Sequence, residues 1–405
     1  MTPQIDVELY RRLFAELAAI GAGPAGWNRL AWGPLEDDAR SWFMARATDL
    51  GLELEQDGAG NLWAIEPDAG AAPLVCAGSH VDTVLDGGAY DGALGVVSAL
   101  VAVEAVRREA RGPRRPLAVG CMVDEEGPRF DAAIFGSRIL CGELEIEPLL
   151  ARVDRDGHAL GELAAARGVT PASLASAPSW LGRIALWLEV HVEQGAALVD
   201  VPAALGIASG LAPRERWRAT FAGAANHAGT TPMAGRRDAL VAAARVVLAA
   251  ETLARGEPGA VATVGRIDAT PGASNVIPGG ATLTLDVRAR AGEALARVRD
   301  GVFAAAGASD GVTVRWSRES ADPGSLFDGE LRATLTRAAA AAGVAAGDLW
   351  AYAGHDAGVL ARHVPAAMLF VRNPTGVSHH PDEFSSEDDC LAGCRVLAGA
   401  LADLA

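Results

Sequence analysis

The pattern that most constrains the fold is an alternation of short apolar runs with helical segments, interrupted once in the middle of the chain. Apolar runs typical of buried strands cover residues 74–80, 117–123, 184–192 and 366–372. Strands that alternate with helices predict an α/β fold with a mostly parallel sheet. Apolar spacing and capping residues predict the helices of this part of the chain. They are residues 6–20, 37–50, 92–110, 131–141, 328–342 and 386–404.

Between residues 211 and 322 the order of elements changes. Strand-like runs RWRATFAG, AVATVGRIDA, ATLTLDVRA and VTVRWSRES are separated by helical segments at 236–254 and 292–306. The order βαββαβ is that of the ferredoxin-like split motif. We therefore expect one catalytic α/β domain, formed by residues 1–210 and 323–405, with a ferredoxin-like domain of residues 211–322 inserted into it.

Composition excludes several classes of function. The chain has a net charge of −16, and all 35 basic residues are arginine. An acidic chain argues against nucleic-acid binding, and a chain without lysine cannot form a Schiff base or a Walker A loop. The longest apolar stretch, Leu94–Val103, is too short to span a bilayer. The N-terminus has acidic residues instead of a signal-peptide pattern, and the five cysteines show no CxxC spacing. We expect a cytoplasmic protein without membrane partners.

Histidines and carboxylates follow four of the predicted strands. They are His80 with Asp82 and Asp91, Glu125 with Glu126, His191, and His379. Sites in open α/β sheets form at the carboxyl ends of the strands, and these donors suit zinc or manganese. A single strand-end histidine is more often a cap or turn residue, and a Glu-Glu pair is often solvated. The coincidence of four such ends favours a metal site, in which one aspartate could bridge two ions about 3.5–4 Å apart.

Two further roles follow from local geometry. Asp82 would accept the free N–H of His80 and thereby fix the tautomer of the ring. Because side chains alternate along a strand, only one of Glu125 and Glu126 can face the metals directly. The other could face the bound water as a general base.

A set of segments then carries a resemblance to a known family. They are GSHVDTVLDGGAYDGALGVV, DEEGPRF, LEVHVEQG, ANHAGTTPM, ASNVIPG with LDVRA, AGHDA and GVSHHPDEF, from about residue 76 to 385. They resemble the metal-dependent amidohydrolases that include N-carbamoyl-L-amino-acid hydrolases, allantoate amidohydrolases and β-ureidopropionases. This family is allied to dinuclear-zinc aminoacylases and carboxypeptidases, and the inferred two-domain layout is similar to it.

The resemblance implies a site with two divalent ions, Mn²⁺ or Zn²⁺. It assigns one metal to His80, Asp91 and His191. Asp91 bridges to the second metal, which Glu126 and His379 also bind. Glu125 is the general base. The related peptidases generally have a carboxylate at the position of His191, so a histidine there indicates the carbamoyl-hydrolase branch.

The resemblance also implies substrate contacts. Gln194 would contact the ureido group, and His355 lies in the AGHDA loop beside the site. In the inserted domain, His227, Asn275 and Arg288 would reach the substrate. His227 would come from the partner subunit of a homodimer and would hydrogen-bond the developing oxyanion. Asp82, Glu125 and His227 would thus be the catalytic residues. The inserted domain would serve as lid and dimerisation domain. Arg288 offers a planar fork for a substrate carboxylate, and Arg214 and Arg216 are further candidates for the anion pocket.

The sequence thus predicts a hydrolase that cleaves a ureido C–N bond and releases ammonia and carbon dioxide. Allantoate, an intermediate of purine catabolism, is the first expected substrate. An N-carbamoyl-L-amino acid is the second, and a β-ureidopropionase activity is a further alternative. An aminoacylase or dipeptidase is less favoured because of His191. A non-catalytic binding module would have lost ligands or the base, yet all six of these positions are filled.

Overall fold

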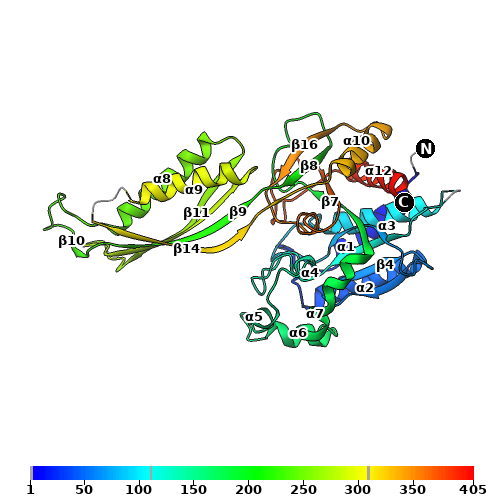
Figure 1. Cartoon of the computed structure of the whole chain (residues 1–405), viewed down its shortest axis with the longest axis horizontal. Coiled ribbons are helices and arrows are strands. Elements are labelled where there is room, and N and C mark those ends of the chain that lie inside the picture. Colours follow the sequence, from blue (N-terminus) through cyan, green and yellow to red (C-terminus); the bar gives the residue numbers. More distant parts are fainter. Residues whose placement is uncertain (1–2, 110–111, 308–310) are drawn as a thin grey trace. The chain divides into compact units, whose positions relative to one another are not determined.

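The computed structural model describes residues 3–109, 112–307 and 311–405 (Figure 1). The chain divides into two compact units. The larger unit contains Met1–Gly210 and Leu326–Ala405, and the smaller contains Leu211–Ser325. The smaller unit is therefore an insertion that ends at Ser325, where the sequence predicted residue 322.

A nine-stranded sheet forms the centre of the larger unit, in the order β15-β8-β17-β7-β5-β6-β4-β3, with β16 paired to β8. The strands are β3 (Glu53–Gln56), β4 (Leu62–Ile65), β5 (Leu74–His80), β6 (Leu117–Met122), β7 (Ile184–Val192), β8 (Leu205–Leu211), β15 (Ser325–Leu326), β16 (Ala346–Ala351) and β17 (Ala366–Val371). A separate small hairpin is formed by β1 (Ala22–Gly23) and β2 (Gly26–Trp27).

The sheet is mixed, and only its centre has the predicted parallel arrangement. Strands β6, β5, β7 and β17 pair in parallel. The pairs β3–β4, β4–β6 and β8–β17 are antiparallel. Strands β3 and β4 are joined by a short turn at Asp57, which accepts the backbone N–H groups of Ala59 and Asn61. Two strands joined so closely must run antiparallel, so the outer strands make the sheet a mixed one around its parallel centre.

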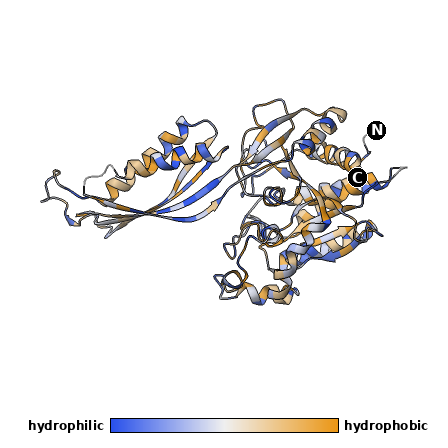
Figure 2. Ribbon diagram, viewed as in Figure 1, coloured by the Kyte–Doolittle hydropathy of each residue, from blue (hydrophilic) through white to orange (hydrophobic). Residues whose placement is uncertain are grey.

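Helices cover the sheet. They are α1 (Val7–Ala19), α2 (Pro34–Asp49), α3 (Ala93–Arg107), α4 (Phe135–Leu140), α5 (Ile146–Leu150), α6 (Leu160–Ala166), α7 (Pro171–Ser176), the 3₁₀ helix η1 (Ala177–Arg183), α10 (Gly329–Ala341), α11 (Asp356–Leu360) and α12 (Glu387–Leu404). The apolar run Leu94–Val103 makes α3 a core helix, buried between the central strands and the helices α1 and α12. Figure 2 shows this concentration of apolar residues. Among the described residues, neither α3 nor another helix is long and apolar enough to cross a membrane.

Two helix starts illustrate what local sequence decides. The predicted cap of the first helix is confirmed, because the Asp6 side chain accepts the backbone N–H of Leu9 at 3.0 Å. The helix predicted at 131–141 begins only at Phe135. Asp131 and Ile134 have positive φ angles of 53° and 60°, which an α-helix cannot contain.

The smaller unit has a four-stranded antiparallel sheet in the order β11-β13-β9-β14. Its elements are β9 (Arg214–Ala222), α8 (Ala239–Gly256), β11 (Ala260–Thr270), β13 (Gly280–Ala289), α9 (Gly292–Gly307) and β14 (Thr313–Asp322). This is the predicted βαββαβ order. Alternate residues of β13, such as Leu283 and Leu285, are buried against α8 and α9. The other residues of β13, such as Asp286 and Arg288, alternate with these and lie on the opposite face of the sheet, which we call the open face.

Candidate metal centre

Four neighbouring strands deliver the candidate ligands to one edge of the sheet. His80 is the last residue of β5, and His191 is the next-to-last residue of β7. Glu125 follows β6, and His379 follows β17. Because β6, β5, β7 and β17 are adjacent and parallel, their carboxyl ends meet at the same edge.

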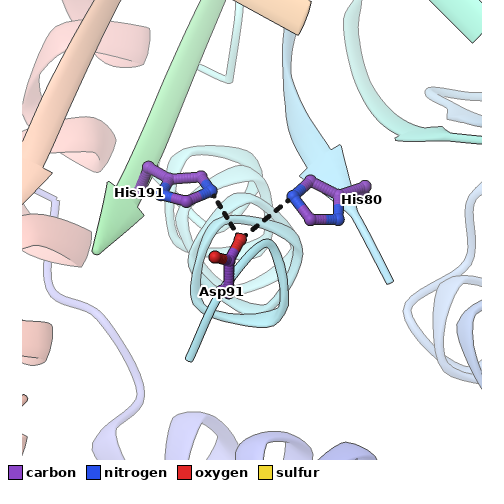
Figure 3. Close-up of side chains that lie close together, drawn as sticks. All are labelled: His80, Asp91 and His191. Carbon is purple, nitrogen blue, oxygen red and sulfur yellow. Dashed lines mark ion pairs between the residues drawn. The ribbon is translucent and has the colours of Figure 1, made fainter. Parts of the chain in front are cut away.

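Asp91 lies between two imidazole rings in the first half of the site (Figure 3). Its Oδ1 is 3.4 Å from Nε2 of His80 and 3.1 Å from Nε2 of His191. In the second half, its Oδ2 is 3.6 Å from Nε2 of His379, which is 3.3 Å from Oε2 of Glu126. Each oxygen of Asp91 thus faces a different group of ligands, which is the arrangement of a bridging carboxylate.

A glycine allows this close approach. Gly92 follows Asp91 at the start of α3 and has a φ angle of 64°. A Cβ atom at this position would lie 2.5 Å from atoms of the His80 ring. The segment YDGA therefore needs glycine for both its backbone conformation and the space beside His80.

Asp82 connects the two sides of the site. His80 Nδ1 lies 3.1 Å from the backbone oxygen of Asp82 and 3.5 Å from its Oδ1. The same carboxylate accepts the backbone N–H of Glu125 at 3.3 Å and that of Glu126 at 3.1 Å. Because Nδ1 of His80 faces oxygen atoms, the neutral ring carries its proton there and directs the lone pair of Nε2 toward Asp91.

The crowded carboxylates differ in their electrostatics. Burial opposes ionisation of Asp91, but the facing His191 and His80 outweigh burial and hold the pKa of this carboxyl well below its usual range. Burial raises the pKa of Glu125 and of Glu126 well above the usual range, and neighbouring carboxylates add to both shifts. Ionising all of these groups together requires positive charge among them.

The residues present fit two divalent cations. His80 Nε2, Glu125 Oε1 and Glu126 Oε1 are buried and have no hydrogen-bond partner among the described residues. Buried polar atoms without partners are costly, and imidazole nitrogens with carboxylate oxygens are ligands that suit Zn²⁺ or Mn²⁺. One ion would be held by His80, Asp91 and His191, whose donor atoms lie within 4.8 Å of one another. Asp91, Glu126 and His379 form a second such group.

Two other predicted residues lie at the centre. Gln194 Nε2 donates to Asp91 Oδ2 at 2.9 Å and lies 3.3 Å from His379 Nε2, so its amide is in direct contact with the second ligand group. His355 is buried, with its ring centre 4.6 Å from that of His191. Burial lowers the pKa of His355 well below the usual range, and the neighbouring His191 adds to this shift.

The remaining predicted residues belong to the smaller unit. His227 is exposed in the short strand β10 (Asn226–His227), which pairs with β12 (Val276–Ile277). Asn275 directly precedes β12, and its backbone oxygen accepts the N–H of Ala228 at 2.9 Å. The structure therefore brings His227 and Asn275 into one hairpin. Arg288 lies on β13, where its Nε donates to Asp286 Oδ1 at 2.7 Å.

Sequence reasoning gave no role to two acidic residues of the centre. Glu383 is buried and accepts the backbone N–H of Asp91 at 3.0 Å. Its carboxylate occupies the space over Gly88, where a Cβ atom would lie 2.2 Å from Glu383 Oε1. Asp124 has a φ angle of 53° and accepts the indole N–H of Trp32 at 2.7 Å. The only sequence signal for either was its place within a motif, because hydrogen bonds to loop backbone leave no periodic pattern.

Comparison with known proteins decides the family. The model of peptidase family M20/M25/M40 matches residues 76–403, which include every candidate ligand. The chain belongs to peptidase family M20/M25/M40. The resemblance seen in the sequence is thereby confirmed.

Relatives named for amidohydrolase activities match almost the whole chain. An N-carbamoyl-L-amino acid amidohydrolase of Geobacillus stearothermophilus is 34% identical over 96% of both chains. An allantoate amidohydrolase of Escherichia coli is 32% identical, also over 96% of both. The crystal structure of an amidase of the hydantoinase/carbamoylase family from Burkholderia multivorans is 31% identical, with a TM-score of 0.88 over 100% of this chain and 98% of that one.

Proposed function

We propose that this protein is a metal-dependent amidohydrolase that cleaves the C–N bond of a ureido acid. The observation that carries the proposal is the position of Asp91, with one oxygen toward His80 and His191 and the other toward His379. The use of histidine at position 191 supports the carbamoyl-hydrolase branch over aminoacylases and dipeptidases. Relatives that match over 96% of the chain are named for this type of reaction.

Glu125 is the general base in this proposal. When bound, divalent cations supply Lewis acidity, which lowers the pKa of water and polarises a carbonyl group. Glu125 Oε2 lies 3.8 Å from His80 Nε2, beside the first ligand group, where it can take a proton from water. The water oxygen bonds to the ureido carbon, and the C–N bond breaks as Glu125 passes the proton to the leaving nitrogen. The carbamic acid that is released decomposes to ammonia and carbon dioxide.

His227 is suited to donate a hydrogen bond to the developing oxyanion. Its Nδ1 accepts the backbone N–H of Gly229 at 3.0 Å and that of Thr230 at 3.2 Å. The neutral ring therefore carries its proton on Nε2, which leaves this N–H available as a donor. Arg288 would bind the substrate carboxylate, Asn275 would contact the substrate beside His227, and Gln194 with His355 would complete the substrate contacts.

We also propose a homodimer, in which His227 of the partner subunit completes each site and the inserted unit acts as lid and dimerisation domain. The support is an apolar surface on this unit. Leu240, Val241 and Leu248 of α8 are 37%, 48% and 64% exposed, and Ile267 of the edge strand β11, on the face that the helices cover, is 41% exposed. Neighbouring exposed apolar residues of this kind favour association.

Two substrate classes fit the site, allantoate and N-carbamoyl-L-amino acids. The test uses metal-depleted protein reconstituted with Mn²⁺ or Zn²⁺ and measures ammonia release from both classes. Acetate release from an N-acetyl-amino acid is the control for aminoacylase activity. Glu125→Gln should abolish turnover without changing the metal content. Absence of ammonia release from every ureido compound, with two metals bound per chain, would refute the proposal.

A further inference from the structure

The open face of the smaller sheet carries a group of three arginines that we call the arginine cluster: Arg214, Arg216 and Arg288. Arg214 and Arg216 are alternate residues of β9, so they point to the same face. Arg288 on β13 is the direct cross-strand partner of Arg214, and Asp286 is that of Arg216. Figure 2 shows long hydrophilic stretches along β9 and β14.

Positive charge is in excess in this cluster. The Asp286 carboxylate receives Arg216 Nε at 2.9 Å and Arg288 Nε at 2.7 Å, so one anion serves two guanidinium groups. Arg214 is half-buried, and its Nε is buried without a hydrogen-bond partner among the described residues. Within the same residues, no ion pair involves Arg214.

The electrostatics of Arg214 agree with this geometry. Burial lowers the pKa of Arg214, and repulsion from Arg216 and Arg288 adds to the shift. Asp286 and Asp322 attract Arg214 less strongly than its two arginine neighbours repel it. Asp322, the partner of Arg214 on β14, also accepts the backbone N–H of Gly324 at 2.8 Å. A half-buried cation in such a setting is stabilised by an additional anion.

Two other arginines on the open face, Arg218 and Arg266, differ from Arg214 because each has an acidic partner. Arg218 is the next residue of the same row on β9, and its Nη2 lies 2.6 Å from Glu319 Oε1. Arg266 on β11 has its Nε 2.6 Å from Asp268 Oδ2. Each of these exposed arginines has its own acid, as expected in a chain with a net charge of −16. Arg214 therefore differs from these two arginines in having two arginine neighbours and no ion pair among the described residues.

We propose that Arg214 binds a second acid group of the substrate, next to the carboxylate that Arg288 binds. The substrate class is then N-carbamoyl-L-amino acids with an acidic side chain, and this assignment rests on the proposed function. Directly paired residues of antiparallel strands have Cβ atoms about 4.5–5.5 Å apart. Two guanidinium forks at this spacing can each bind one of two carboxylates separated by two or three carbon atoms. Allantoate, with its single carboxylate, would leave Arg214 without a partner.

The test compares substrates that differ only in the second acid group. N-carbamoyl-L-glutamate and N-carbamoyl-L-glutamine have nearly the same shape, and kcat/KM for each measures the value of the charge. We expect the metal-loaded wild-type enzyme to prefer the acid by tenfold or more. Arg214→Gln should lose this preference, because kcat/KM on the acid falls by tenfold more than kcat/KM on the amide, whereas Arg214→Lys should keep part of it. Arg218→Gln, a matched control on the same strand, should behave as the wild type.

Several results would overturn the assignment. Equal wild-type kcat/KM on the acid and the amide would do so, as would a loss in Arg214→Gln that is the same for both substrates. If no ureido compound is hydrolysed, the proposed function fails, and calorimetric binding of the same two compounds decides the present inference separately. Tighter binding of the acid that disappears in Arg214→Gln would support it, and equal binding would refute it.

Discussion

Replacing Glu383 by leucine should weaken cation binding at Asp91 more than it weakens the fold. Glu383 accepts the backbone N–H of Asp91 at 3.0 Å and also accepts that of Tyr90. It lies four residues after His379, so its carboxylate connects the loop of the second ligand group to the residue that both groups share. Leucine has a similar size but cannot accept either hydrogen bond.

The expected losses in stability and in metal affinity follow from these contacts. Two buried N–H groups would lose their acceptor, at a cost of about 1–3 kcal/mol each. This loss is partly offset, because burial and repulsion from Asp91 raise the pKa of Glu383 to about 8 and make its carboxylate costly in the metal-free protein. We therefore expect a loss of about 1–3 kcal/mol in the free energy of unfolding without metal. Residues that orient ligands typically contribute about 10–100-fold to metal affinity, and a loss of this size is expected for Glu383→Leu.

The assay titrates Mn²⁺ into metal-free protein against a competing chelator, and thermal unfolding of the same samples reports the fold. Glu383→Gln is the control, because its side-chain oxygen can still accept the two hydrogen bonds, and its metal affinity should stay within about threefold of wild type. Wild-type affinity in Glu383→Leu would refute the reasoning. So would an equal loss of affinity in both variants, because it would assign the effect to the negative charge.

Three further predictions concern the same centre. Metal-free protein should lose stability as pH rises from about 5 to 8. The reason is that a carboxyl with a raised pKa in the folded protein, such as Glu383, holds a proton that the unfolded chain releases near pH 4.3. A melting temperature that rises over this range would contradict the prediction. Gly92→Ala should lower metal affinity at least tenfold, since its Cβ would displace the His80 ring; metal content after dialysis measures this, and unchanged content would show that the ring can move. Mixing inactive Glu125→Gln with inactive His227→Ala should restore about a quarter of wild-type activity if each site uses His227 of the partner subunit; no recovery in verified mixed dimers would exclude the shared site.

The sequence could place most of the candidate ligands at one edge of the sheet because they end an apolar strand or lie in the loop after one. The runs that end at His80 and His191 could only be buried strands, and parallel strands bring their carboxyl ends together. The inserted βαββαβ unit was predicted for a similar reason, since its strands alternate apolar and polar residues over eight or more positions. The strong periodicity therefore allowed the fold to be predicted, and the ends of the predicted strands indicated the candidate ligands.

What the sequence did not indicate depends on contacts between loops. The hydrogen bond of Glu383 to Asp91 joins residues 292 positions apart, and no local pattern reports such a contact. The left-handed conformation of Ile134, which shortens α4, is equally unexpected for a β-branched residue. The short helices between residues 146 and 183 are too brief to show a clear period. The excess of positive charge around Arg214 could not be predicted from the sequence either, because it depends on which residues face one another across β9 and β13.

The insertion also sets the order in which the centre can be completed during synthesis. His80, Asp91 and His191 precede the inserted unit, whereas His379 and Glu383 follow it. The late strand β17 lies between β7 and β8 in the finished sheet, so a nascent chain that ends within the insertion has an unpaired edge at β7, the strand that carries His191. Such a chain holds ligands for one cation only. The centre can therefore bind a second cation only after the C-terminal segment has taken its place in the sheet.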